Sequence, residues 1–556
     1  MTTVPEVLYR TIQEVPDRLA LILQSRDGDQ AITYADLIRG AIGYANILER
    51  AGVGRSEPAI LLLQHGRPLI EAFFGAILHG AIPAIMPFLT EKLSPERYRQ
   101  SLAALIEITK PAVIITYPEF ADEVAKARTE GDSVRSVCLW TEVEPPAEIS
   151  WETLGGMDSE PEDIVLLQHS SGTTGLQKGV ALSHQSVLSQ LKAYAKAINM
   201  TSDDVVVSWL PLYHDMGLIA GFIMPILLRS KLVLMSPFDW IRAPYRLLSA
   251  ISQYGGTLSW LPNFAYNFSA RKVRDRDLDN VDLSSWRAVI NCSEPMRWKS
   301  HEEFFNRFSK YGLKRQALAT CYAMAENVFA VTQGGIESPV VLDEIDRRSL
   351  SEGQIAVPAK GGEDAIKMLS TGQPIEGTRV RVIDADGKDL PDRRVGEIAL
   401  KGDCLLSGYY NRDDLTQKTF MDSWYITGDL GYLVDGELFV TGRKKELIIV
   451  GGKNVFPQDL EELAMEVEAV HPGRVVAFGI FNEDIGTEEI CVIAEVDVIE
   501  DDARAKIARE IRDQISRGTD VTARYVLTVD RGWLIKTSSG KIARGANRDK
   551  YLTEFA

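Results

Sequence analysis

Apolar and polar residues follow two different spacings along the first part of the chain. Residues 36–51 carry apolar side chains at helical spacing, and residues 58–63 form a short apolar run typical of a buried strand. Residues 65–79 again predict a helix, residues 81–86 a strand and residues 95–109 another helix. Strands and helices that follow one another at such short intervals predict a parallel sheet wrapped by helices.

The alternation continues through the middle of the chain and then changes. A helix is predicted at residues 185–198, with strands at residues 163–168, 179–182, 205–209, 231–235, 257–260 and 288–291. After about residue 374, short strands are joined by turns such as Ala385-Asp-Gly, which predicts an antiparallel sheet. We interpret this part as a small β-barrel at about residues 374–441.

The last part of the chain has its own pattern. From residue 445 onwards the predicted order is strand, helix, two strands, helix and strand. The predicted fold class is therefore α/β. We expect a large N-terminal domain at residues 1–443, made of parallel sheets wrapped by helices plus the small β-barrel, and a small mobile α+β domain at residues 444–556.

Composition and charge narrow the class of protein. The 556 residues are 45% hydrophobic and 25% charged, as in ordinary soluble proteins, and a net charge of −17 argues against general nucleic-acid binding. The five cysteines are scattered without a CxxC spacing, which favours a reducing cytoplasm. The longest apolar stretch, residues 69–89, is interrupted by Glu71, His79 and Pro83, so no membrane span is expected. The first residues do not resemble a signal peptide.

One loop carries a chemical signal of its own. Residues 169–179 read His-Ser-Ser-Gly-Thr-Thr-Gly-Leu-Gln-Lys-Gly and lie between two predicted strands. Glycines let the backbone approach a ligand, successive N–H groups form an anion-binding concavity, and Lys178 adds a positive charge. The loop is not a Walker motif, because no Gly-Lys-Ser/Thr occurs. Taken alone, it is compatible with a polyphosphate site and with a flexible surface turn.

The loop resembles the phosphate loop of the adenylate-forming (AMP-binding) superfamily, which includes acyl-CoA synthetases, luciferases, peptide-synthetase adenylation domains and fatty acyl-AMP ligases. Gln177 stands where the family usually has proline. The resemblance implies ATP and Mg²⁺ as cofactors. By that match the nucleotide would contact Ser170, Ser171, Gly172, Thr173, Thr174, Gly175, Lys178, Ser293, Glu294, Pro295, Cys321, Tyr322, Ala323, Met324, Asp429 and Arg443.

Residues 321–326, Cys-Tyr-Ala-Met-Ala-Glu, resemble a family segment that reads Tyr-Gly-Met-Thr-Glu. The match implies that Tyr322 stacks on adenine and that Glu326 binds Mg²⁺ together with Thr174. Ala323 and Ala325 replace the usual glycine and threonine, so a hydroxyl near the phosphates is lost. Residues 291–295 resemble the loop that places Ser293 and Glu294 near the base.

Three further matches lie towards the C-terminus. Asp429 falls where the family binds both ribose hydroxyls, and a carboxylate suits a diol because it offers two acceptor oxygens. Arg443 is expected to contact ribose or phosphate, and Lys445 falls at the family's hinge. Lys541, in Lys-Thr-Ser-Ser-Gly-Lys, matches the catalytic lysine of the mobile domain, although Ile535 replaces the usual preceding proline.

A further catalytic match is His214, in Trp-Leu-Pro-Leu-Tyr-His-Asp-Met-Gly, which would border the acyl site. The resemblance implies that a fatty or other hydrophobic acid attacks the α-phosphorus of ATP to form acyl-AMP and pyrophosphate. Residues 340–367 look like the insertion of fatty acyl-AMP ligases, which pass the acyl group to the phosphopantetheine thiol of an acyl carrier protein.

Two alternatives stay open. Gly451-Gly452 is closer to acyl-CoA ligases, in which two glycines leave room for the pantetheine arm, so CoA remains a second acceptor. A non-catalytic nucleotide-binding homologue is a third interpretation, which substitution of Glu326, Asp429 or Lys541 would favour; none is substituted. Amino-acid activation is disfavoured, because no Phe-Asp-x-Ser segment is present.

Overall fold

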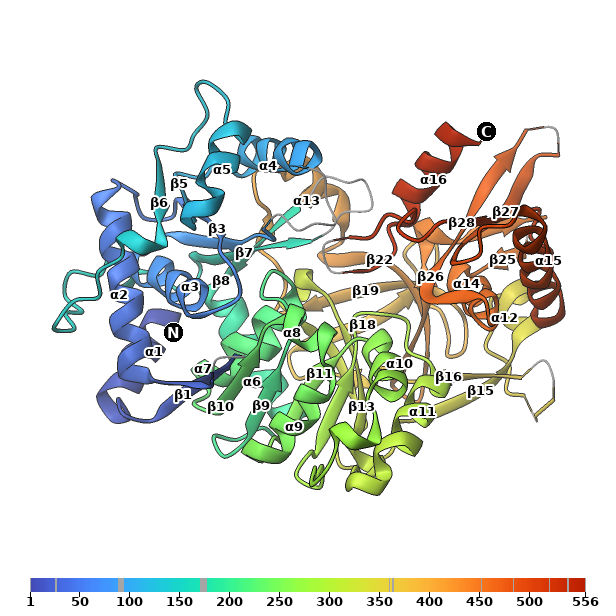
Figure 1. Ribbon diagram of the computed structural model, residues 1–556, viewed down its shortest axis with the longest axis horizontal. Coiled ribbons are helices and arrows are strands. Elements are labelled where there is room, and N and C mark those ends of the chain that lie inside the picture. Colours follow the sequence, from blue (N-terminus) through green and yellow to red (C-terminus); the bar gives the residue numbers. More distant parts are fainter. Residues whose placement is uncertain are drawn as a thin grey trace.

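The chain folds into a larger N-terminal part and a smaller C-terminal part that lie side by side (Figure 1). The structure is a computed structural model. It describes residues 2–25, 28–88, 95–170, 178–359, 361–362, 365–451, 453–483, 485–519, 521–537 and 540–555.

The largest element is a nine-stranded sheet with the order β17-β14-β13-β12-β11-β9-β10-β1-β2. Its strands are β1 (Leu19–Gln24), β2 (Gln30–Thr33), β9 (Val205–Ser208), β10 (Lys231–Met235), β11 (Leu258–Leu261), β12 (Ala288–Asn291), β13 (Leu318–Ala323), β14 (Ala330–Gly334) and β17 (Gln373–Pro374). The six strands from β13 to β1 in this order run parallel, as predicted. A second parallel sheet, β4-β3-β5-β6, contains β3 (Pro58–Leu62), β4 (Ile82–Ile85), β5 (Val113–Thr116) and β6 (Ser136–Leu139).

Helices cover these sheets (Figure 1). They are α1 (Val4–Glu14), α2 (Tyr34–Arg50), α3 (Arg67–His79), α4 (Pro95–Thr109), α5 (Ala121–Ala127), α6 (His184–Ala197), a π-helical segment η4 (Met216–Ile223), α7 (Met224–Leu227), α8 (Pro237–Arg242), α9 (Tyr245–Tyr254), α10 (Asn263–Lys272) and α11 (Trp298–Phe308). Local sequence fixes their ends. Helix α2 begins after Thr33, whose hydroxyl accepts from the Asp36 N–H while the Asp36 carboxylate reaches back, a capping box.

A β-hairpin carries the predicted phosphate loop. Strands β7 (Ile164–Ser170) and β8 (Lys178–Ser183) pair antiparallel, and β20 (Gly408–Tyr409) adds to the other edge of β8. The predicted strands on both sides of the loop are therefore confirmed.

The antiparallel region predicted after residue 374 is present as a five-stranded sheet of β18 (Thr378–Ile383), β19 (Gly396–Gly402), β21 (Phe420–Met421), β22 (Trp424–Val434) and β23 (Glu437–Arg443), with α13 (Asp413–Thr419) beside it. Within residues 340–367 the chain forms β15 (Leu342–Asp346), α12 (Arg347–Gly353) and the start of β16 (Ala365–Leu369). Strands β15 and β16 pair with each other as a separate hairpin.

The C-terminal part has its own sheet and core. It contains β24 (Ile448–Val450), β25 (Lys453–Val455), α14 (Pro457–Met465), β26 (Val470–Asn482), β27 (Thr487–Val496), α15 (Asp501–Gly518), β28 (Tyr525–Val529) and α16 (Arg544–Glu554). Leu460, Ile490 and Ile511 belong to an apolar cluster confined to this part. The sequence prediction ended on a strand and missed α16. None of the helices in the described part of the chain combines the length and the apolar character that a membrane crossing requires.

Candidate functional site

The predicted nucleotide residues come from strand ends that lie next to each other. Ser293, Glu294 and Pro295 follow β12, and Tyr322 lies near the end of β13, the neighbouring parallel strand. The carboxyl ends of parallel strands are the usual place for ligands in open α/β sheets. The fold therefore brings Ser293 and Tyr322, which are well separated in the sequence, to neighbouring strand ends.

Tyr322, Asp429 and Arg443 form one hydrogen-bonded group. The Tyr322 hydroxyl donates to Asp429 Oδ2 at 2.6 Å, and Arg443 Nε donates to Asp429 Oδ1 at 3.1 Å. Asp429 and Arg443 face each other across the β22–β23 pair. Burial, together with the charge of Asp429, raises the pKa of Tyr322, so the phenol stays a donor at neutral pH. Arg443, expected on ribose or phosphate, here contacts Asp429.

Glu326 sits in a turn that the surrounding structure holds firmly. It lies in a short 3-10 turn after β13, and Val328 behind it has a φ of 61° and a ψ of −54°. A β-branched residue rarely adopts this conformation, which costs on the order of 1–3 kcal/mol. The Asn327 side chain donates to the Ala330 carbonyl at 2.7 Å, and the Glu326 carbonyl accepts from Leu406 N at 2.8 Å. Burial raises the pKa of Glu326, because removal from water disfavours the charged carboxylate.

Lys178 and Glu326 are connected through Tyr409. The Tyr409 hydroxyl donates to Glu326 Oε1 at 2.9 Å, and Lys178 Nζ lies 5.0 Å from the centroid of the Tyr409 ring. Burial lowers the pKa of Lys178, while the charge of Glu326 opposes this. The phosphate-loop lysine and the predicted metal ligand therefore share one aromatic residue.

His214 pairs with a residue that the sequence reading did not single out. His214 Nδ1 lies 2.6 Å from Asp215 Oδ1, and Asp215 also accepts from the N–H of Met216. Burial favours the protonated form of Asp215, but the charges of His214 and Lys541 and the hydrogen bonds lower its pKa below the ordinary value. The positive charge of Lys541, in the C-terminal part, is thus felt by Asp215 in the N-terminal part.

Lys541 lies in the C-terminal part, between β28 and α16. Thr537 and Lys541 bind each other twice, because Thr537 N donates to the Lys541 carbonyl at 2.8 Å and Lys541 N donates to Thr537 Oγ1 at 3.2 Å. Gly540, with a φ of 86°, makes the tight turn.

The loop predicted to lie near the base has an unusual backbone. Ser293 adopts a φ of 68°, and its hydroxyl lies 3.9 Å from Met216 Sδ. Glu294 Oε2 accepts from Phe264 N, near the start of α10, at 2.9 Å. Glu294 therefore holds α10 against the loop, a role that the sequence did not suggest.

The predicted magnesium ion needs oxygen ligands from side chains of the site. No group of three or more His, Cys, Asp and Glu side chains that could hold a metal occurs among the described residues. Mg²⁺ usually binds through one or two carboxylates and the phosphates of a nucleotide, so a single buried carboxylate fits an ion that arrives with ATP. Glu326 supplies that carboxylate.

Several predicted residues cannot be placed. Ser171, Gly172, Thr173, Thr174, Gly175 and Gly452 lie outside the described residues, and Ser170 is the last residue of β7. Cys321 and Ala323 lie in β13 and Met324 directly after it. Sequence reasoning missed Tyr409 and Asp215. Asp215 could have been found because it directly follows His214, whereas Tyr409 has no charge and no motif spacing to mark it.

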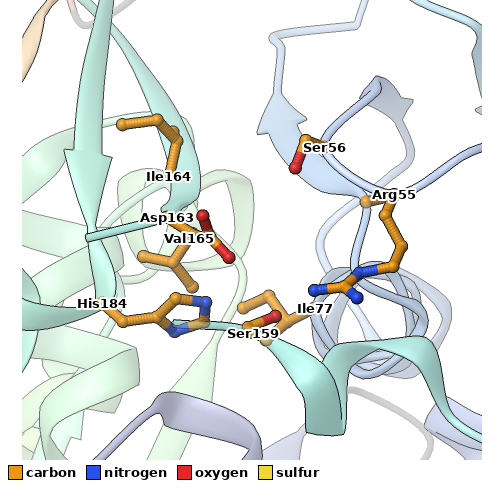
Figure 2. A pocket seen from close by; sticks show the side chains of 10 residues that line it. Arg55, Ser56, Ile77, Ser159, Asp163, Ile164, Val165 and His184 are labelled. Atoms are coloured by element: carbon orange, nitrogen blue, oxygen red, sulfur yellow. The ribbon is translucent and has the colours of Figure 1, made fainter. Parts of the chain in front are cut away.

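A small cavity lies at the other end of the β7–β8 hairpin. Figure 2 shows Asp163 and His184, which flank the hairpin, together with Arg55 and Ser159 around it. Its volume is about 10 Å³, room for roughly one water molecule. It is too small for a substrate and lies away from the predicted phosphate loop.

Comparisons with known proteins identify the family of this chain. A model of the family described as AMP-binding enzyme matches residues 8–410. The medium-chain-fatty-acid–acyl-carrier-protein ligase JamA of Moorena producens (strain JHB) is 31% identical over 574 residues, which cover 99% of this chain and 95% of that protein. The 4-hydroxyphenylalkanoate adenylyltransferase of Mycobacterium tuberculosis (strain ATCC 25618 / H37Rv) is 30% identical, over 99% of this chain and 92% of that protein.

A solved structure from a study of fatty acyl-adenylate ligases from E. coli and L. pneumophila is similar over 100% of this chain and 98% of its own, with a TM-score of 0.90 and 27% sequence identity. The fold and these relatives agree. The chain therefore belongs to the AMP-binding enzyme family.

Proposed function

We propose that this protein uses ATP to convert a fatty or other hydrophobic carboxylic acid into acyl-AMP, with release of pyrophosphate, and then passes the acyl group to the phosphopantetheine thiol of an acyl carrier protein. The observation that carries the proposal is the buried, hydrogen-bonded arrangement of Asp429 with Tyr322 and of Glu326 with Tyr409, next to Lys178. The charge of Lys541, from the C-terminal part, adds to it by lowering the pKa of Asp215. A protein that only binds a nucleotide, without catalysing a reaction, does not require Lys541.

Adenylation requires charge to be stabilised where it gathers. The acid oxygen attacks the α-phosphorus in line, the bond to the bridging oxygen breaks, and pyrophosphate leaves with the electron pair. Asp429 holds the ribose hydroxyls, and Lys178 and Lys541 stabilise negative charge on phosphate oxygens. Mg²⁺, when bound with ATP at Glu326, supplies further positive charge. The short His214–Asp215 contact orients the histidine, which is proposed to border the substrate's acyl group.

We further propose that residues 1–443 and 444–556 move relative to each other, with the hinge near Lys445. Lys444 and Lys445 lie in a short 3-10 turn between β23 and β24, and both side chains are exposed. A short, exposed turn between two strands can absorb the backbone rotation that removes Lys541 and admits the thiol.

The acceptor is proposed from the contacts of residues 340–367. Arg347 Nη1 donates to the Gly518 carbonyl of the C-terminal part at 2.6 Å, and Lys453 Nζ pairs with Glu352 at 2.7 Å. Helix α12 also lies against β25 (Figure 1). These contacts support a restrained rotation, which disfavours CoA and favours a carrier protein. The name of the relative JamA points to the same acceptor.

CoA stays the second candidate, because Gly451 has a φ of 56° and lies in the β24–β25 hairpin next to the hinge. A side chain there would be strained, so the hairpin keeps a backbone that leaves room for a ligand.

The test has two steps. ATP–pyrophosphate exchange is measured with a panel of medium-chain, long-chain and arylalkanoic acids, and we expect exchange that depends on the acid and on Mg²⁺. CoA and a phosphopantetheinylated carrier protein are then offered side by side, and we expect thioester only on the carrier. A variant with Arg347→Ala and Glu352→Ala is expected to gain CoA thioester; the absence of any gain would contradict the role of residues 340–367.

A further inference from the structure

Tyr409 lies between Glu326 and Lys178, but the proposed reaction assigns it no role. Its phenol is almost fully buried and contacts the two residues proposed to act on the phosphates and the metal, Glu326 and Lys178. The two contacts use different parts of the same side chain. The hydroxyl donates a hydrogen bond to the Glu326 carboxylate, and the face of the ring contacts the Lys178 ammonium.

The hydroxyl of Tyr409 has a defined direction. It lies 2.9 Å from Glu326 Oε1 and 3.0 Å from the hydroxyl of Tyr425. An ionised carboxylate only accepts, so the single Tyr409 proton goes to Glu326 and the Tyr425 proton goes to Tyr409. Two tyrosines thus form a one-way chain that ends on the carboxylate. A hydrogen bond to a charged acceptor is stronger than one between neutral groups.

The backbone around Tyr409 is fastened on both sides. On one side Leu406 N donates to the carbonyl of Glu326 at 2.8 Å. On the other, Tyr410 N donates to the Gly179 carbonyl at 2.8 Å, directly after Lys178 in β8. The Tyr409 N–H itself is held by Thr416 Oγ1 at 2.9 Å. The segment from 406 to 410 therefore bridges the turn that carries Glu326 and the strand that carries Lys178.

We propose that Tyr409 is a positioning residue that sets Glu326 and Lys178 at a fixed spacing, so that the carboxylate and the ammonium meet Mg²⁺ and the ATP phosphates together. The proposal rests on the proposed function, because it needs a bound Mg·ATP. Tyr409 itself touches neither phosphate nor metal and acts through the two residues that do.

The two contacts can be separated by substitution. Tyr409→Phe keeps the ring beneath Lys178 and removes the hydroxyl from Glu326. Tyr409→Leu removes both. Tyr432→Phe is a matched control, because Tyr432 is also buried and also donates to a carboxylate, Asp343 Oδ2, at 3.0 Å, but it stands outside the site. Any general effect of losing a buried tyrosine hydroxyl should appear in the control as well.

The experiment measures ATP binding by calorimetry, once with a chelator and once at saturating Mg²⁺, so that the ratio of the two affinities reports the metal's contribution without any turnover. In Tyr409→Phe we expect this ratio to fall about tenfold, the size of one hydrogen bond to a charged group, with metal-free affinity within about twofold of wild type. In Tyr409→Leu we expect metal-free affinity to fall a further three- to tenfold, roughly, as the cation–π contact is lost. Tyr432→Phe should match the wild type in both.

Two results would overturn the proposal. One is a Tyr409→Phe protein whose ratio of ATP affinities with and without Mg²⁺ equals that of the wild type. The other is a Tyr432→Phe protein in which this ratio falls as far as in Tyr409→Phe. Far-ultraviolet circular dichroism of each variant checks that it is folded. A wild-type protein that binds no Mg·ATP would instead contradict the proposed function, so the two failures are distinguishable.

Discussion

The two parts of the candidate site are held in different ways. The ribose and metal end lies in the N-terminal part, where Tyr322, Asp429 and Glu326 are buried and joined by hydrogen bonds of 2.6 to 3.1 Å with neighbouring side chains. The C-terminal part meets the N-terminal part through the buried Phe456, which joins the apolar cluster of Tyr432 and Phe439, and through ion pairs at partly exposed positions. Arg297 contacts Asp459 at 2.8 Å and Glu462 at 3.2 Å.

This difference suits the two halves of the reaction. Buried hydrogen bonds are costly to leave unmade, so the nucleotide end keeps its shape with or without a ligand. Partly exposed ion pairs are weak and sensitive to salt, so they can be exchanged for others when the C-terminal part moves. Under the proposed function, a fixed nucleotide site is combined with a lysine that can leave it.

The largest loss of activity is expected from substituting Lys541, the proposed catalytic residue of the C-terminal part. Lys541→Ala should lower the rate of pyrophosphate exchange by about 10²–10³, because one charged contact to the transition state is lost, while ATP affinity stays close to wild type. Exchange assays and calorimetry measure the two quantities. Full exchange activity in this variant would refute the assignment of Lys541.

A smaller effect is expected in the fixed half. Asp429→Asn should weaken ATP binding by about 10- to 100-fold, since hydrogen bonds to a charged acceptor are lost, and should also leave Arg443 without its ion pair. The sharper measurement compares ATP with 2′,3′-dideoxy-ATP. The wild type should prefer ATP strongly and the variant should hardly distinguish them; an equal preference in both proteins would show that Asp429 does not hold the ribose.

Acidification should lower the stability mainly of the N-terminal part, because this part contains buried neutral histidines. Burial lowers the pKa of His184 to about 4 and that of His301 to about 3. These folded-state values lie below the unfolded value, so the folded protein loses stability as pH falls from about 6.5 towards 4, on the order of 2–3 kcal/mol per histidine. Calorimetry at pH 7 and pH 5 measures the loss. His184→Gln should reduce the pH dependence, and an identical unfolding temperature at both pH values would contradict the account.

The smallest effect is expected where the two parts meet. Arg297→Ala should lower exchange about two- to fivefold, as expected for ion pairs worth no more than about 1 kcal/mol, and the effect should shrink in high salt. Lys299→Ala is a control in the same interface, because its pair with Glu466 is more exposed. If Arg297→Ala were as active as Lys299→Ala at low salt, Arg297 would have no part in holding Lys541 near the site.

Much of the fold could be predicted from the sequence, for a physical reason. Buried parallel strands such as β12 and helices such as α4 carry their period in their apolar residues, so the pattern reveals them. The terminal helix α16 was missed because its segment, Arg-Gly-Ala-Asn-Arg-Asp-Lys, is polar and follows a loop, and only Asn547 and Tyr551 are buried. Tertiary packing, not local pattern, stabilises that helix.

Residues of the candidate site were predictable where a segment of the sequence resembles the family. Lys178, Glu326 and Asp429 lie in segments with a family resemblance, but Tyr409 reaches them only because β20 pairs with β8, which lies more than 200 residues away in the sequence. The direction of the Glu294 carboxylate also depends on α10 packing nearby. Such contacts are decided by three-dimensional pairing and have no signal along one sequence.

The most direct measurement is the product itself. The protein is incubated with ATP, Mg²⁺ and a medium-chain fatty acid in the absence of any thiol, and the nucleotides are quantified by mass spectrometry. We predict acyl-AMP and pyrophosphate in equal amounts, with no acyl-AMP when the acid is left out. Bound but unreacted ATP with every acid tested, or ADP and phosphate in place of acyl-AMP and pyrophosphate, would contradict the claim that this site adenylates carboxylic acids.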